Sequence, residues 1–177
     1  MKEMESHRLI FLDESGSHLG MSRTHGRIEG NARLKMPIPL NKGTRVSMIA
    51  AIGLEDIHTS HVGEGAVNGT IFKEFIEQRL CPCLQPGDTV IMDNLSVHKV
   101  PGIQKAIEAK GATLLYLPPY SPDLSPIEMM WSKVKAYLRK KAARTLEALY
   151  SAIQEAFHRV SPQDLKGWFQ HCGYRVQ

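Results

Sequence analysis

The chain has 177 residues, which is enough for one α/β domain with a substantial core but not for two. Hydrophobic residues make up 42% of it, and no apolar run approaches the roughly eighteen residues that cross a bilayer, so a membrane-spanning protein is excluded. The net charge of +4 is too small to indicate a partner by itself, while three cysteines and the lack of a secretion signal predict reduced thiols in a cytoplasmic protein.

The first third of the chain predicts three strands. Residues 8–13 form an almost continuous apolar run that ends in an acid, which is typical of a buried central strand. Residues 14–43 are rich in Gly, Arg, Pro and Asn and predict an irregular excursion. Residues 44–53 and 57–62 predict two further strands joined by a turn.

Helical and strand patterns then alternate. Apolar residues at helical spacing follow residue 65 and predict a helix capped by Asn68 or Thr70 and ended before Pro82. Residues 89–92 and 113–117 predict buried strands, separated by a helix over 101–110. This order implies parallel strands joined by crossovers.

The C-terminal third predicts three helices. Residues 126–141 carry apolar residues three and four apart, which defines one buried helical face. A helix over 145–160 follows, and Ser161-Pro162 begins a last one that buries Leu165, Trp168 and Phe169. No internal repeat or domain boundary is visible, so we expect residues 1–177 to form a single domain.

Three acidic residues stand where metal ligands would be expected. Asp13 ends the LIFLD strand, Asp93 ends TVIMD, and Glu128 lies in the first turn of the helix that begins at Pro126. Carboxylates at the carboxyl ends of buried strands point into the crevice where open α/β sheets bind ligands. Together they predict a cluster of hard oxygen ligands for Mg²⁺ or Mn²⁺.

Each acid also has a purely structural interpretation. Asp13 could cap a turn, and Asp93-Asn94 is a common turn pair. Ser125 and Glu128 form an S-x-x-E pattern, so this glutamate could simply complete a capping box. Their joint arrangement favours a shared metal site acting on phosphodiesters. A receiver or phosphatase-like fold is weakened because no Asp-x-Asp follows the first strand.

Basic residues gather on the helix that carries Glu128. They fit a polyanionic substrate beside the carboxylates, although a solvated helix flank is the simpler interpretation of a charge run. The residues are Lys133, Lys135, Arg139, Lys140 and Lys141, and Arg144 lies just beyond the helix. A second basic stretch follows the first strand. Zinc binding by Cys81 and Cys83 with His58 or His61 lacks the usual ligand spacing, so incidental cysteines are favoured.

These segments resemble the catalytic domain of a DDE transposase of the mariner superfamily, in its bacterial six-thirty insertion-sequence branch. The resemblance rests on the order of the motifs and on the 34 residues between Asp93 and Glu128. The similar segments are FLDESG at 11–16, GMSRTHGR, RVSMIAAI, VIMDNLSVHK at 90–99 and LPPYSPDLSPIEMMWSKVK at 117–135.

The resemblance implies an RNase H-like fold: a mixed five-stranded sheet flanked by helices. It implies that Asp13, Asp93 and Glu128 bind two divalent ions, Mg²⁺ or Mn²⁺, with Asp13 bridging both. Asn94 and His98 would orient Asp93 or contact the scissile phosphate. Glu14 should point to the opposite face from Asp13, and Asp123 precedes the helix, so neither is expected to be a ligand. The candidate phosphate contacts are Lys133, Lys135, Arg139 and Lys140.

The implied reaction is DNA cleavage at a transposon end, followed by joining of the freed 3′ hydroxyl to target DNA, typically at a TA site, by a homodimer on the DNA. The helix-turn-helix modules usual in the family are missing from this sequence, so we expect a catalytic domain whose specificity segment comes from an upstream reading frame, or a truncated relic, or a fragment. An RNase H-type nuclease that only hydrolyses nucleic acid, and an inactive DNA-binding remnant, are the alternatives.

Overall fold

A mixed five-stranded sheet forms the centre of the computed structural model, which describes residues 6–30 and 33–176. The strand order is β3-β2-β1-β4-β5. The strands are β1 (Leu9–His18), β2 (Arg45–Ile52), β3 (Ile57–Glu64), β4 (Thr89–Met92) and β5 (Thr113–Tyr116). β1, β2 and β3 pair antiparallel, whereas β4 pairs parallel with both β1 and β5. The predicted mixed sheet is therefore confirmed.

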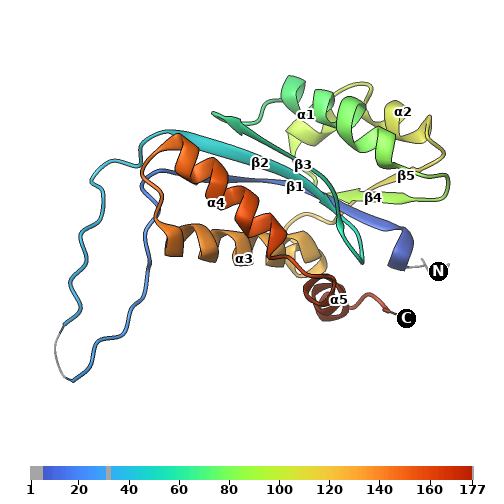
Figure 1. Cartoon of the computed structure of the whole chain (residues 1–177). Helices are drawn as coiled ribbons and strands as arrows, with labels where there is room; N and C mark the ends of the chain where they lie inside the picture. The colour runs from blue at the N-terminus through green and yellow to red at the C-terminus, as the bar shows by residue number, and fades with distance from the viewer. Residues whose placement is uncertain (1–5, 31–32, 177) are drawn as a thin grey trace.

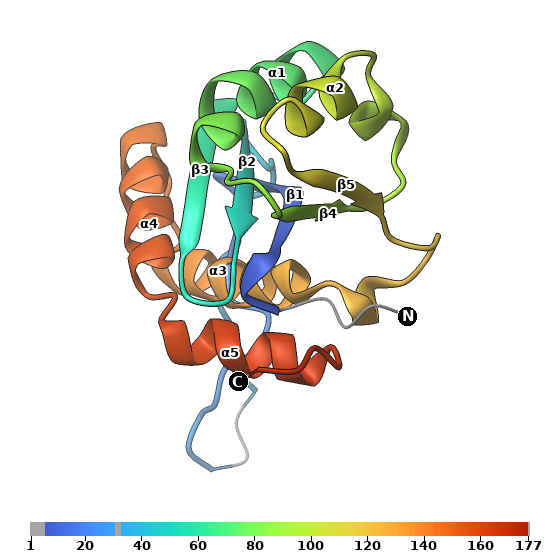
Figure 2. The same cartoon turned by 90° about the vertical axis from the view of Figure 1, so that its right-hand side faces the viewer.

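Helices cover both faces of this sheet (Figures 1 and 2). The first two helices lie on one face and the last three on the other. They are α1 (Gly69–Phe75), α2 (Ile103–Glu108), α3 (Pro126–Lys141), α4 (Leu146–His158) and α5 (Pro162–His171). Of the expected residues in α5, Leu165 and Phe169 are buried, while Trp168 is only partly buried.

The central strand β1 divides the core into two layers. Leu9 and Phe11 pack with the layer formed by α3, α4 and α5, and Ile10 and Leu12 pack with α1 and α2. Side chains alternate along a strand, so Asp13 lies on the same side as Leu9 and Phe11, and Glu14 lies on the same side as Ile10 and Leu12. Asp13 and Glu14 therefore face opposite sides of the sheet, as predicted.

β1 is longer than the sequence predicts. It runs to His18, so Asp13 does not end the strand but lies inside it, opposite Ala50 of β2. The polar residues after Asp13 remain in the strand because antiparallel pairing with β2 supplies their backbone hydrogen bonds, which overrides a weak strand propensity. Within β1, β4 pairs with Leu9 to Phe11 and not with the residues after them. Asp13 consequently lies just beyond the carboxyl end of β4, where Asp93 follows.

The helix after β3 begins and ends where expected, but its last part is not α-helical. Asn68 is its cap, because the Asn68 side chain accepts a hydrogen bond of 2.9 Å from the backbone N–H of Ile71. After α1 the chain continues through a wider π-helical turn, Ile76–Leu80, and a 3₁₀ turn, Cys81–Cys83. The helix therefore ends before Pro82, as expected, and Pro82 lies in the first turn of a new 3₁₀ segment, where proline is tolerated.

Residues 19–30 and 33–44 leave the sheet between β1 and β2 as parts of a long loop that projects from the body of the domain (Figure 1). Its base is tied to the junction of α3 and α4 by Arg144. The guanidinium of Arg144 donates to the carbonyls of Leu19 and Met21, at 2.7 and 2.9 Å, and to the Ser22 hydroxyl at 3.0 Å. In the part of the chain described, no helix has the length and apolarity to cross a membrane.

Candidate active site

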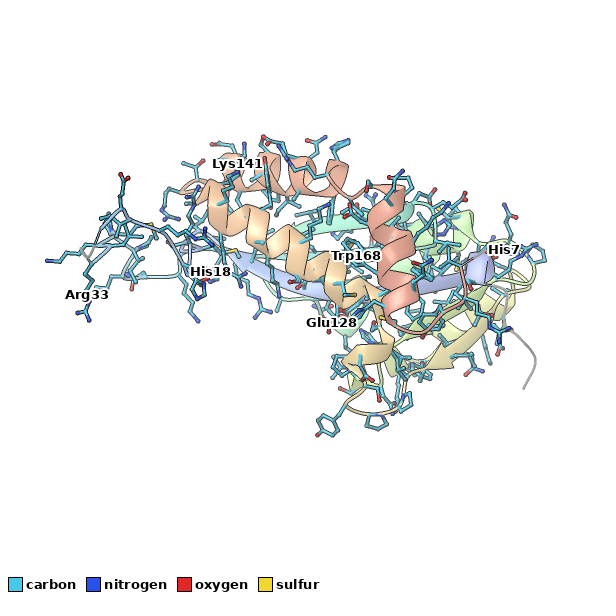
Figure 3. The ribbon with its side chains drawn as sticks, turned by 90° about the horizontal axis from the view of Figure 1, so that it is seen from below. His7, His18, Arg33, Glu128, Lys141 and Trp168 are labelled. Atoms are coloured by element: carbon cyan, nitrogen blue, oxygen red, sulfur yellow. The ribbon has the colours of Figure 1, made fainter. Side chains whose placement is uncertain are left out.

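One pocket brings the three predicted carboxylates together. It has a volume of about 400 Å³ and contains Asp13 from β1, Asp93 after β4, and Glu128 from the first turn of α3. Figure 3 shows Glu128 at the end of α3, with Lys141 at the opposite end. Leu12, Asn94, Leu95, Ser125 and residues 117–122 complete the lining. The site therefore draws on segments from three separate parts of the sequence.

Asp13 is held by a buried tryptophan. The indole Nε1–H of Trp131 donates to Asp13 Oδ2 at 3.0 Å, and Trp131 itself is only 2% exposed. Burial is the main reason that the pKa of Asp13 is raised to about 7. The negative charges of Glu14, Glu128 and Asp93 act in the same direction. A buried carboxyl whose pKa is raised by neighbouring negative charges marks a site that a cation would stabilise.

Asp93 is anchored through one of its two oxygens. Asp93 Oδ1 accepts the backbone N–H of Leu95 at 3.0 Å and lies 2.5 Å from His98 Nδ1. His98 belongs to a short 3₁₀ turn, Ser96–Lys99, and its side chain is fully buried. The ring stacks on Phe72 of α1 with a centroid distance of 4.4 Å. The prediction that His98 could orient Asp93 thus has a structural counterpart.

The other nitrogen of the same ring contacts Glu14. His98 Nε2 lies 2.7 Å from Glu14 Oε2, so the imidazole stands between two carboxylates. Burial is the largest influence on this ring and lowers its pKa, but the hydrogen bond and charge of Glu14 and the charge of Asp93 outweigh it, so the pKa of His98 is raised. Sequence reasoning set Glu14 aside and missed this contact.

Glu128 is exposed and does not cap its own helix. Ser125 is the N-cap of α3, but in the described residues its side chain makes no capping hydrogen bond. The backbone N–H of Ser125 donates instead to the carbonyl of Pro122, at 3.0 Å. A capping box does form elsewhere, between Ser161 and Asp164 at α5. The capping-box interpretation of Glu128 is therefore wrong, and its carboxylate remains available to the pocket.

The donors suit a hard divalent cation, since all three are carboxylates. As the side chains stand, however, no three His, Cys, Asp or Glu residues of the described part of the chain are close enough to ligate one ion. Asp13 and Asp93 are fixed by their neighbours, whereas Glu128 is exposed. A metal site formed by all three carboxylates therefore stays a prediction.

The remaining predicted residues lie at different places. Asn94 is exposed and lines the pocket. Lys133 is already paired, because its Nζ lies 2.5 Å from Asp164 Oδ2 at the start of α5. Arg139 and Lys140 line a separate hollow of about 350 Å³ with Arg23 and His25 of the projecting loop. Lys135 lies on α3 with a half-buried side chain.

A family model described as DDE superfamily endonuclease matches residues 8–150. The chain belongs to this DDE endonuclease family. The matched region includes all three carboxylates, Glu14, His98 and Trp131. The comparison with curated proteins found no match.

Among solved structures, this DDE endonuclease chain is similar to Mos1 transposase. A paired-end complex of Mos1 with the left transposon end has a TM-score of 0.75 at 15% identity, covering 94% of this chain and 52% of that one. A pre-cleavage Mos1 transpososome has a TM-score of 0.72 at 13% identity, covering 97% and 57%. The catalytic domain of Mos1 mariner transposase has a TM-score of 0.64 at 12% identity, covering 94% and 77%. The predicted RNase H-like fold is thereby confirmed, and the DDE endonuclease chain spans about half the length of the Mos1 chains in the DNA complexes.

Proposed function

We propose that this chain is the catalytic domain of a transposase of the mariner superfamily, in the bacterial six-thirty insertion-sequence branch. It would cleave DNA at transposon ends and join the freed 3′ end to target DNA at TA sites. The observation that carries this proposal is the meeting of Asp13, Asp93 and Glu128 in one pocket of a DDE endonuclease domain. The similar Mos1 structures include a strand transfer complex, which supports the joining step.

Asp13, Asp93 and Glu128 would hold two divalent ions, Mg²⁺ or Mn²⁺. Structures of Mos1 paired-end complexes with Mg and with Mn support this choice. When bound, such ions stabilise the attacking and leaving oxygens of an in-line displacement at phosphorus. The chain itself supplies a central carboxylate on β1, a second one fixed by His98, and a third on the exposed first turn of α3.

The surrounding residues orient these groups. Trp131 holds Asp13 Oδ2, which restrains this carboxylate at the pocket that Asp13 lines. Leu95 and His98 hold Asp93 Oδ1, which leaves Oδ2 available for ligation. The exposed Asn94 lies beside Asp93 on the pocket wall and would contact the scissile phosphate. Two copies of the chain on paired transposon ends are the assembly we expect, and it would act at the bacterial nucleoid.

Strand transfer is the result that separates a transposase from a nuclease. We expect a 3′-hydroxyl transposon-end oligonucleotide, incubated with the protein, Mn²⁺ and a plasmid, to become covalently joined to the plasmid. A gel that resolves joined product from nicked plasmid measures this outcome. Nicking without joining would assign the chain to the RNase H-type nucleases, and neither product would identify an inactive DNA-binding remnant.

The hollow between the basic end of α3 and the projecting loop is the DNA-backbone contact we expect. In Figure 3 the loop, with Arg33 in its outer part, lies on the same side of the molecule as the Lys141 end of α3. Arg139 and Lys140 face Arg23 across this hollow. They are better candidates than Lys133 and Lys141, which pair with Asp164 and Glu155.

Replacing Arg139 and Lys140 together with alanine should weaken binding to all DNA sequences alike. Each phosphate contact releases counterions, so the slope of log affinity against log salt concentration should fall by about 1.8 for two contacts. Fluorescence anisotropy with labelled duplexes over a salt series measures both effects. The matched control is the double variant Lys110→Ala with Lys166→Ala. It removes the same amount of positive charge, from the turn after α2 and from α5 respectively. Equal slopes in the two double variants would contradict the assignment.

A further inference from the structure

We propose that Glu14 is a positioning residue of this site: through His98 it fixes the carboxylate of Asp93 in the orientation that binds a divalent cation. The inference rests on the proposed metal-dependent function and extends it to a residue on the opposite face of the sheet. The chain of contacts runs from Glu14 Oε2 to His98 Nε2, at 2.7 Å, and from His98 Nδ1 to Asp93 Oδ1, at 2.5 Å.

Asp93 needs such support because of where it lies. It follows the last residue of β4, in a stretch without helical or strand hydrogen bonding, and 43% of its side chain is exposed. The Leu95 N–H and His98 Nδ1 both lie against Oδ1, at 3.0 and 2.5 Å, and His98 Nδ1 also contacts the Asp93 backbone carbonyl at 3.4 Å. Two anchors on one oxygen restrict rotation of the carboxylate and direct the other oxygen away from His98.

His98 can act as an anchor only if its ring is itself held. Its flat face stacks on Phe72, and its backbone carbonyl accepts the Tyr116 hydroxyl at 3.0 Å. These contacts fix the plane and the backbone of the residue, but not the direction of Nε2. Glu14 provides that last constraint, because a fully buried ring nitrogen requires a hydrogen-bond partner and Glu14 is the partner that it meets.

Glu14 is well placed for this role because it lies on the central strand of the sheet. β1 lies between β2 and β4, and Glu14 pairs with Ile49 in the antiparallel ladder. Its side chain is 20% exposed and points to the α1 layer, away from the pocket that contains Asp13. Glu14 therefore acts on the metal site from the opposite face of the sheet. It does so through His98, as a carboxylate does that is hydrogen-bonded to a histidine and so sets its orientation at a metal site.

The test is Mn²⁺ binding to the DNA-free protein, measured by electron paramagnetic resonance. Glu14→Met keeps the length of the side chain but removes the acceptor, and we expect it to weaken Mn²⁺ binding roughly 10- to 100-fold. Glu14→Gln keeps an acceptor oxygen but loses the charge, so its affinity should fall less than that of Glu14→Met. Asp123→Asn is the control, because it removes one exposed negative charge just before α3 and should leave the affinity unchanged.

Thermal unfolding of each variant without metal separates positioning from folding. Weaker Mn²⁺ binding by a folded Glu14→Met, restored in part by Glu14→Gln, supports the proposal. An affinity equal to that of the wild type in folded Glu14→Met overturns it while leaving the proposed function intact. If Glu14→Met does not fold, Glu14→Gln decides, and an unchanged affinity there overturns the proposal. A wild-type protein that binds no Mn²⁺ overturns the proposed metal site itself, and the role of Glu14 with it.

Discussion

Replacing Asp13 with asparagine should reduce metal-dependent DNA cleavage by more than about 100-fold, the upper figure for losing an outer-shell partner of a metal ligand. Asparagine keeps the shape of the side chain and an oxygen for Trp131, so the change removes the charge while preserving the packing. Conversion of supercoiled to nicked plasmid with Mg²⁺ or Mn²⁺ measures the loss. Glu128→Gln should give the same result, although Glu128 is exposed and Asp13 is not.

The same substitution should have an opposite effect on stability without metal. The pKa of Asp13 is raised to about 7 in the folded protein, above the ordinary value of 3.8, so ionising this carboxyl destabilises the fold progressively as the pH rises between those values. Asp13→Asn removes that effect, and its unfolding midpoint at pH 8 should exceed that of the metal-free wild type. Asp123→Asn serves as the control in both assays. An Asp13→Asn protein that cleaves normally would show that the site is misassigned.

Replacing Trp131 with alanine should lower the free energy of unfolding by about 3–5 kcal/mol, the range for truncating a large buried aromatic residue. Trp131 is among the largest fully enclosed side chains and lies in the core layer between β1 and α3. Its loss would leave a cavity directly behind Asp13 and remove the donor to Asp13 Oδ2. Urea denaturation followed by circular dichroism measures the change.

Trp131→Phe separates the packing of the Trp131 ring from its hydrogen bond to Asp13. Phenylalanine retains much of the packing but has no N–H, so we expect a smaller loss of stability together with clearly reduced cleavage activity. Leu138→Ala, in the same helix and also buried, is the control that removes packing without touching Asp13. If Trp131→Phe kept full activity, the indole hydrogen bond would have no part in orienting Asp13.

Features with a local cause are the ones that the sequence predicts well. α3 occupies the predicted residues 126–141, because its apolar spacing, its proline at the start and its basic last turn all act within one helix. The cap of α1 is likewise one of the two residues predicted, Asn68 or Thr70, because capping depends on the side chain and its position: Asn68 is the cap. The five-stranded sheet followed from the order of strands and helices together with the resemblance to the transposase family.

Features that depend on distant partners could not be predicted in the same way. The extension of β1 to His18 runs through polar residues that have little intrinsic preference for a strand, and it exists because β2 pairs with them. The contact between Glu14 and His98 joins residues 84 positions apart. Nothing in either local sequence marks the other as its partner, so only the folded chain reveals that a residue behind the sheet supports the site.

A single straight helix, α3, carries Glu128 at one end and Lys140 near the other. At 1.5 Å of rise per residue these positions are separated by about 18 Å along the axis, which corresponds to roughly five base pairs of duplex at 3.4 Å each. A duplex lying along α3 would meet its phosphate contacts at a set spacing from the point of cleavage. The length of α3 would then set the distance between the cleaved bond and the phosphates that Arg139 and Lys140 contact. Inserting one helical turn between Trp131 and Arg139 would shift those contacted phosphates relative to the cleavage point.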